Sequence, residues 1–177
     1  MSHLEHEYLY ILVGIMKAKV YIETSVISYL TSRPSQDIVI AGHQQTTRDW
    51  WATYRAQFDV VASQLVVQEA SAQEASAGDP QAAQQRLAVL AELKLLAVTE
   101  EAIALAHALV EGGPLPAQAA EDALHIAIAV TNGIEYLITW NCKHLANASM
   151  RKDIDRICRL RGYEPIVICT PEELIEG

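Results

Sequence analysis

Cysteine is scarce in this chain of 177 residues. Its three cysteines are Cys142, Cys158 and Cys169. They are odd in number and far apart, and they form neither a Cys-x-x-Cys pair nor the spacing of a zinc site. This argues against a disulfide scaffold and a structural zinc fold, and it predicts reduced cysteines in a cytoplasmic protein.

Aromatic residues are also few, at 6% of the chain, although hydrophobic residues as a whole make up 51%. Ala, Leu, Val and Ile dominate, which favours helices covering aliphatic strands over an aromatic-rich β-sandwich. The length suits one domain with a substantial core.

Basic residues are outnumbered, with 13 Lys and Arg against 22 Asp and Glu and a formal net charge of −9. Such a charge argues against a protein that holds nucleic acid passively. It leaves open a nuclease that recruits divalent cations, because the cations invert the local charge.

Long apolar runs and phosphate-binding loops are missing as well. The segment YLYILVGIM, residues 8–16, is too short to span a bilayer and lacks the features of a signal peptide. We expect residues 1–16 to be an N-terminal extension, either a start-site extension or a small added strand, and residues 17–177 to form the domain. No Gly-x-Gly-x-x-Gly, no Gly-Lys-Ser/Thr and no serine nucleophile elbow occurs, which argues against nucleotide-cofactor and serine-hydrolase functions.

Strand-like segments alternate with helical segments along the rest of the chain. Strands are predicted at residues 19–22, 58–62, 95–98, 136–139 and 165–169. Helices are predicted at 26–30, 36–57, 64–77, 81–93, 100–111, 116–132 and 149–162. The expected helix caps are Thr24 or Ser25, Ser63, Thr99 and the pair Asn132-Gly133. This alternation predicts an α/β fold with three layers, α/β/α, around a mostly parallel sheet of four to five strands.

Acidic and polar residues stand where such a sheet would place a site, beside the carboxyl ends of its strands. Glu23 follows the first strand and Asn141 follows the fourth, while Glu69 and Asp122 lie on adjoining helices among apolar residues. Asp122 shares a helix face with apolar residues, where a carboxylate is costly unless it is paired or bound to a metal. Each acid alone has a plain structural explanation, at a helix N-terminus or on a solvated helix, so the functional case depends on their combination.

Four segments of the sequence resemble the PIN-domain family, in particular the toxins of VapBC-type toxin–antitoxin pairs. They are VYIETSVISYL at 20–30, LVVQEAS at 65–71, AEDALHIAIA at 120–129 and YLITWNCKHLAN at 136–147. The resemblance runs from about Lys17 to near the C-terminus and implies a PIN-like fold. It implies a divalent-metal-dependent endoribonuclease that acts as a toxin, with RNA as substrate, a small antitoxin as partner and a homodimeric state.

The resemblance also implies roles for particular residues. Glu23, Glu69 and Asp122 would hold Mg²⁺ or Mn²⁺, which prefer oxygen ligands. Asn141 replaces the family's fourth acid and would orient a metal-bound water or the substrate. The residues expected beside substrate or ligands are Thr24, His125 and Lys143.

Two departures from the family pattern keep an alternative open. Glu23 stands where most members have Asp, and Asn141 is neutral. A catalytically weakened PIN-like interaction module is therefore the second hypothesis. A metal-dependent phosphatase is the third, but it needs a nucleophilic aspartate at a strand end, which Glu23 suits poorly.

Two further clusters have more than one interpretation. Trp50, Trp51 and Tyr54 would either stack on RNA bases, or pack in the core or against a partner helix, and we favour packing. A basic group near the C-terminus would be either an RNA-facing rim or a solvated helix face balanced by acids. Its members are Arg151, Lys152, Arg156, Arg159 and Arg161.

Overall fold

The computed structural model describes residues 17–77 and 80–175. Its strands are β1 (Lys19–Ile22), β2 (Asp59–Ser63), β3 (Lys94–Leu96), β4 (Tyr136–Ile138) and β5 (Val167–Cys169). All four strand pairings are parallel and give the order β3-β2-β1-β4-β5, so β1 lies at the centre of the sheet.

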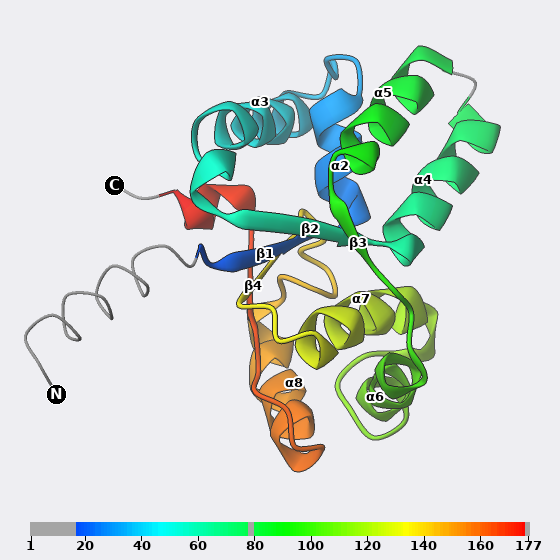
Figure 1. The fold of residues 1–177 in the computed structure, drawn as a ribbon, viewed down its shortest axis with the longest axis vertical. Coiled ribbons are helices and arrows are strands. Elements are labelled where there is room, and N and C mark those ends of the chain that lie inside the picture. Colours follow the sequence, from blue (N-terminus) through cyan, green and yellow to red (C-terminus); the bar gives the residue numbers. More distant parts are fainter. Residues whose placement is uncertain (1–16, 78–79, 176–177) are drawn as a thin grey trace, which may run out of the picture.

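Helices cover both faces of this sheet (Figure 1). One layer contains α2 (Thr24–Thr31), α3 (Ile38–Thr53), α4 (Gln64–Ala77) and α5 (Pro80–Ala91). The other contains α6 (Glu100–Glu111), α7 (Ala120–Thr131) and α8 (Ala148–Leu160). Short 3-10 turns occupy Arg55–Gln57, Ala117–Ala119 and Pro171–Leu174. The predicted three-layer α/β/α fold with a parallel sheet is confirmed.

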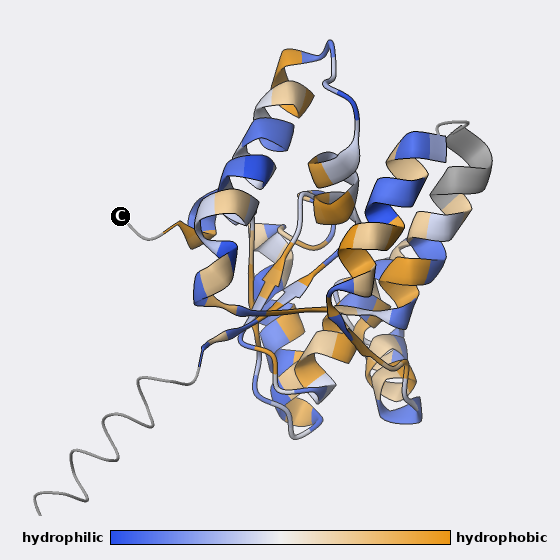
Figure 2. Cartoon of the chain, turned by 45° about the horizontal axis from the view of Figure 1, so that its top comes forward, coloured by the Kyte–Doolittle hydropathy of each residue, from blue (hydrophilic) through white to orange (hydrophobic). Residues whose placement is uncertain are grey.

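The core lies between the sheet and its two helical layers. Figure 2 shows mostly hydrophobic strands between helices that alternate hydrophobic and hydrophilic residues. Val20, Tyr21 and Ile22 of β1 are fully buried, as are Ile126 and Ile128 of α7. Each such aliphatic side chain contributes about 1.5–3 kcal/mol by its burial, which fixes α7 firmly against the sheet.

Several predicted helix ends are confirmed. The hydroxyl of Ser63 accepts a hydrogen bond from Val66 N at 3.3 Å, and that of Thr99 accepts one from Ala102 N at 3.2 Å. Gly133 has φ +62°, the left-handed conformation that ends α7.

Two predicted helix starts are wrong. The N-cap of α2 is Glu23, not Thr24 or Ser25: Glu23 keeps the extended backbone of β1, and its carboxylate accepts a hydrogen bond from Ser25 N at 3.1 Å. The helix expected from residue 116 begins at Ala120, because a 3-10 turn over Ala117–Ala119 precedes it.

The N-terminal extension predicted at residues 1–16 lies outside the described residues, so the domain boundary stays a prediction. Within residues 17–77 and 80–175, no helix is long and apolar enough to cross a bilayer. All three cysteines are free. Burial raises the pKa of the Cys158 thiol to about 11 and that of Cys169 to about 12, so both stay protonated near neutral pH.

Of the predicted aromatic cluster, Trp50 packs inside the protein. Trp50 is fully buried, stacks on Phe58 with ring centroids 5.9 Å apart, and donates its indole N–H to Leu174 O at 3.1 Å. Trp51 is half-buried, and the guanidinium carbon of Arg55 lies 4.6 Å from the centroid of the Trp51 ring. The packing interpretation is therefore confirmed for Trp50.

Candidate metal centre

Strand register brings three polar side chains to one place. Tyr21 of β1 pairs with Val61 of β2 and with Leu137 of β4. Side chains two positions apart in extended chain point to the same face. The next residues on that face are therefore Glu23, Ser63 and Thr139, at the carboxyl edge of the sheet.

Glu23 is held by donors from two elements. It is 7% exposed, and its Oε2 accepts hydrogen bonds from Ser25 N at 3.1 Å and Ser25 Oγ at 2.5 Å. Thr139 Oγ1 donates to the same oxygen at 2.8 Å. Because Glu23 also caps α2, the positive end of that helix favours its negative charge.

Glu69 comes from α4 and meets α2 and α7. Its Oε2 accepts a hydrogen bond from the Thr24 hydroxyl and lies 3.0 Å from Nε2 of His125. Thr24 and His125 are 3% and 1% exposed, so both contacts are shielded from water. Thr24 and His125 thus both contact Glu69, and their role beside a bound ligand stays a prediction.

The contact with His125 changes the protonation equilibria of both residues. Burial alone would raise the pKa of Glu69, but hydrogen bonding and the charge of His125 lower it below its ordinary value. Burial alone would lower the pKa of His125, whereas Glu69 and the nearby charges of Glu23 and Asp122 raise it. Both shifts favour the charged forms.

A cation would fit between these groups. One ligand atom each from Glu23, Glu69 and His125 lies within 4.8 Å of the others. The hydrogen bonds that the described residues make to the two glutamates all end on Oε2. Each Oε1 is therefore left without such a partner, and two carboxylate oxygens are the ligands that Mg²⁺ and Mn²⁺ prefer.

Asp122 belongs to a second hydrogen-bonded group beside the first. Its Oδ1 accepts from Asn141 Nδ2 at 2.8 Å, and its Oδ2 lies 2.8 Å from Nδ1 of His144. Thr139 joins the two groups, because its hydroxyl accepts from Asn141 N at 2.9 Å while it donates to Glu23. Asn141 thus lies beside the predicted acids but binds one of them directly.

Lys143 is placed differently. It is exposed, and the hydrogen bond found for it is that of its backbone oxygen with Asn147 Nδ2 at 2.9 Å. In the described part of the chain, no hydrogen bond or ion pair links the Lys143 side chain, or the basic side chains of α8, to the carboxylates. Arg156 of α8 instead forms an exposed ion pair with Asp153 at 3.3 Å.

The sequence does not predict the hydroxyl groups around the acids. Ser25 and Thr139 donate hydrogen bonds to Glu23, and Ser63 lies 2.7 Å from the Tyr21 hydroxyl. The strand register would have indicated two of these hydroxyls, because Ser63 and Thr139 lie two positions beyond Val61 and Leu137, the partners of Tyr21. Sequence alone does not give that register, since it depends on which strands pair.

Comparison with known proteins identifies the fold. No protein-family model and no curated relative matches the chain. Among solved structures, VapC20 of Mycobacterium tuberculosis, a sarcin-ricin loop cleaving toxin, matches with a TM-score of 0.55 and 17% identity. The match covers 73% of this chain and 95% of that one. The chain has the VapC fold.

A second structure with this fold agrees. VapBC2 from Rickettsia felis, bound to a DNA fragment from its promoter, matches with a TM-score of 0.54 and 12% identity, over 85% of this chain and 96% of that chain. The PIN-like fold expected from the sequence motifs is thus confirmed. In this VapC fold the carboxylates lie at the carboxyl edge of the central strands, the position that parallel α/β sheets use for ligands.

Proposed function

We propose that the protein is a divalent-metal-dependent endoribonuclease and the toxin of a toxin–antitoxin pair. The observation that carries the proposal is the cluster of Glu23, Glu69 and His125 at the carboxyl edge of the sheet in a VapC fold. Thr139 and Asn141 connect Glu23 to a third acid, Asp122. VapC20, described as a toxin that cleaves the sarcin-ricin loop, supports an RNA substrate, and VapBC2 supports a small antitoxin partner. A homodimeric state belongs to the same proposal.

The side chains have separate tasks in this mechanism. Glu23 and Glu69 would hold the cation, and Asp122 would add negative charge beside them. A bound Mg²⁺ or Mn²⁺ would supply an activated water and neutralise the phosphate charge. Ser25 and Thr139 keep the Glu23 carboxylate in place, while Asn141 and His144 hold that of Asp122.

Metal removal gives the direct test. The purified chain is expected to cleave RNA in the presence of Mn²⁺ or Mg²⁺, to stop when EDTA removes the cation, and to recover when Mn²⁺ is restored, because the cation would supply the activated water that cleavage needs. Denaturing gels of varied RNAs measure cleavage, and calorimetric titration measures Mn²⁺ binding. Inactivity of the wild type on every RNA and metal would remove the main support for the proposal.

A catalytically weakened interaction module is the second candidate. It is favoured by the amide of Asn141, which donates a hydrogen bond to Asp122 where the family has another acid. A chain that has the fold but binds no Mn²⁺ in the titration would support this candidate over the ribonuclease.

Restoring the acid at position 141 tests the geometry of the second group. Asn141→Asp removes a hydrogen bond at 2.8 Å and places two carboxylates side by side. We expect a lower melting temperature without metal, and a larger Mn²⁺-induced rise than in wild type, because a cation relieves the repulsion. Asn147→Asp is the matched control: Asp keeps the cap of α8, and the substitution removes only an exposed amide hydrogen bond to Lys143 O. An unchanged response to Mn²⁺ would place position 141 outside the metal shell.

A further inference from the structure

A chain of buried polar groups lies beneath the carboxylates. The Tyr21 hydroxyl is 2.7 Å from Ser63 Oγ and 2.7 Å from Nδ1 of His125. His125 continues the chain, with its Nε2 3.0 Å from Glu69 Oε2. Tyr21 and Ser63 are fully buried and His125 is 1% exposed.

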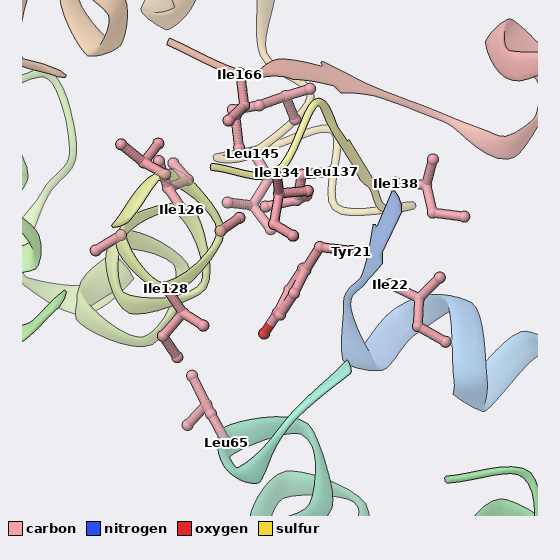
Figure 3. Packing of buried hydrophobic residues seen from close by; sticks show 14 of the residues in the cluster. Tyr21, Ile22, Leu65, Ile126, Ile128, Ile134, Leu137, Ile138, Leu145 and Ile166 are labelled. Carbon is pink, nitrogen blue, oxygen red and sulfur yellow. The ribbon is translucent and has the colours of Figure 1, made fainter. Parts of the chain in front are cut away.

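These groups lie in the apolar core, where polar atoms are costly. Figure 3 shows the Tyr21 ring leaving β1 among aliphatic side chains, with its hydroxyl oxygen directed to the side where Leu65 and Ile128 lie. An unpaired hydroxyl or imidazole in such surroundings costs about 1–3 kcal/mol. A phenylalanine would fill the same volume without that cost, so packing alone does not explain the tyrosine.

The contacts leave His125 little freedom to turn. Both of its ring nitrogens are engaged, Nδ1 by Tyr21 and Nε2 by Glu69, and the two contacts fix the ring on opposite sides. His125 and the Thr24 hydroxyl then hold the same oxygen of Glu69, Oε2. Among the described residues, no hydrogen bond ends on the other oxygen of Glu69, Oε1.

We propose that Tyr21 and His125 form a positioning relay that aims the free oxygen of Glu69 at the cation, and that His125 is not itself a metal ligand. The inference rests on the proposed metal-dependent function. Removal of a group that hydrogen-bonds to a metal ligand and orients it typically lowers metal affinity about 10–100-fold. The relay therefore extends the metal centre from the sheet edge into the core of the protein.

Coordination by His125 is the competing arrangement, since its Nε2 lies within the same 4.8 Å cluster. It would require Nε2 to exchange its contact with Glu69 for the cation. Pulsed electron paramagnetic resonance of the Mn²⁺-loaded chain separates the two arrangements. We expect no coupling to a directly bound imidazole nitrogen, and such a coupling would overturn the assignment of His125 as a positioning residue.

Tyr21→Phe tests the relay with little change in packing. Mn²⁺ affinity, measured by calorimetry on the full chain, is expected to fall about 10–100-fold. Tyr136→Phe is the matched control: it removes a tyrosine hydroxyl from β4 at the opposite end of the strand and should leave the affinity unchanged. Circular dichroism checks that both variants fold.

A second pair of variants covers the histidine. His125→Leu should weaken Mn²⁺ binding at least as much as Tyr21→Phe, whereas His125→Gln, whose amide donates from the position of Nε2, should recover most of the affinity. Wild-type affinity in folded Tyr21→Phe and His125→Leu would overturn the relay and leave the proposed function standing. Absence of Mn²⁺ binding in the wild type would overturn the proposed function and the relay with it.

Discussion

Asp122→Asn is expected to lower the rate of RNA cleavage about a thousandfold, equivalent to about 4 kcal/mol of transition-state stabilisation. The substitution keeps the size of the side chain but removes a negative charge from the carboxylate group. In the wild type, the two oxygens of Asp122 contact Asn141 Nδ2 and His144 Nδ1. The amide of the variant has only one oxygen, so it cannot accept from both. Initial rates at saturating Mn²⁺ measure the loss.

Glu121→Gln is the control for this experiment. Glu121 is the preceding residue, is exposed, and loses the same charge without touching the cluster. Its cleavage rate should stay close to that of the wild type, and thermal melts should show that both variants fold. Equal losses in the two variants would mean that overall charge, rather than the position of Asp122, supports cleavage.

Trp50→Ala is expected to lower the free energy of unfolding by about 3–5 kcal/mol. The substitution empties a fully buried site, ends the stacking on Phe58 and leaves Leu174 O without its indole donor. Since domains are typically stable by only about 5–15 kcal/mol, the variant will be close to unfolding. Urea titration followed by circular dichroism measures the change.

Trp51→Ala provides the comparison within the same helix. Its ring is half-buried and its named contact is the Arg55 guanidinium, so the expected loss is about 1–2 kcal/mol. Equal losses for the two tryptophans would contradict the assignment of Trp50 to the core. A stable Trp50→Ala protein with weakened RNA binding would instead favour the base-stacking interpretation.

The sequence predicted the layers and most element boundaries because local signals agree with the fold. Aliphatic segments mark the strands. The hydroxyl of Thr99 caps the start of α6, and the left-handed backbone of Gly133 ends α7, as the residue types predict. The predicted start of α2 is wrong because Glu is not among the preferred N-cap residues, whereas the adjacent Thr24 and Ser25 are. The cap at Glu23 follows from its extended backbone, which only the strand pairing of β1 fixes.

The candidate site was only partly predictable. Ordered motifs indicated the acids, and the structure brings Glu23 and Glu69 into one cluster. Thr139 and Asn141 connect Glu23 to Asp122 by hydrogen bonds. Their orientation depends on Thr139 and His144, which lie in sequence far from the acids they contact. Such pairings depend on strand order and on helix packing, neither of which follows from local propensity.

Because β1 pairs with a strand from late in the sequence, the site can form only after most of the chain has been synthesised. Glu23 belongs to the first strand, whereas Thr139, which holds its carboxylate, is 116 residues further along the chain. Parallel pairing between such distant segments forms slowly, because the chain loses the entropy of loop closure before it gains the stabilising contacts. During synthesis, a chain that has emerged only as far as α6 already contains Glu23 and Glu69 but has no β4 to dock beside β1. Assembly of the centre is therefore a late folding event, and a truncated or incompletely synthesised chain lacks it.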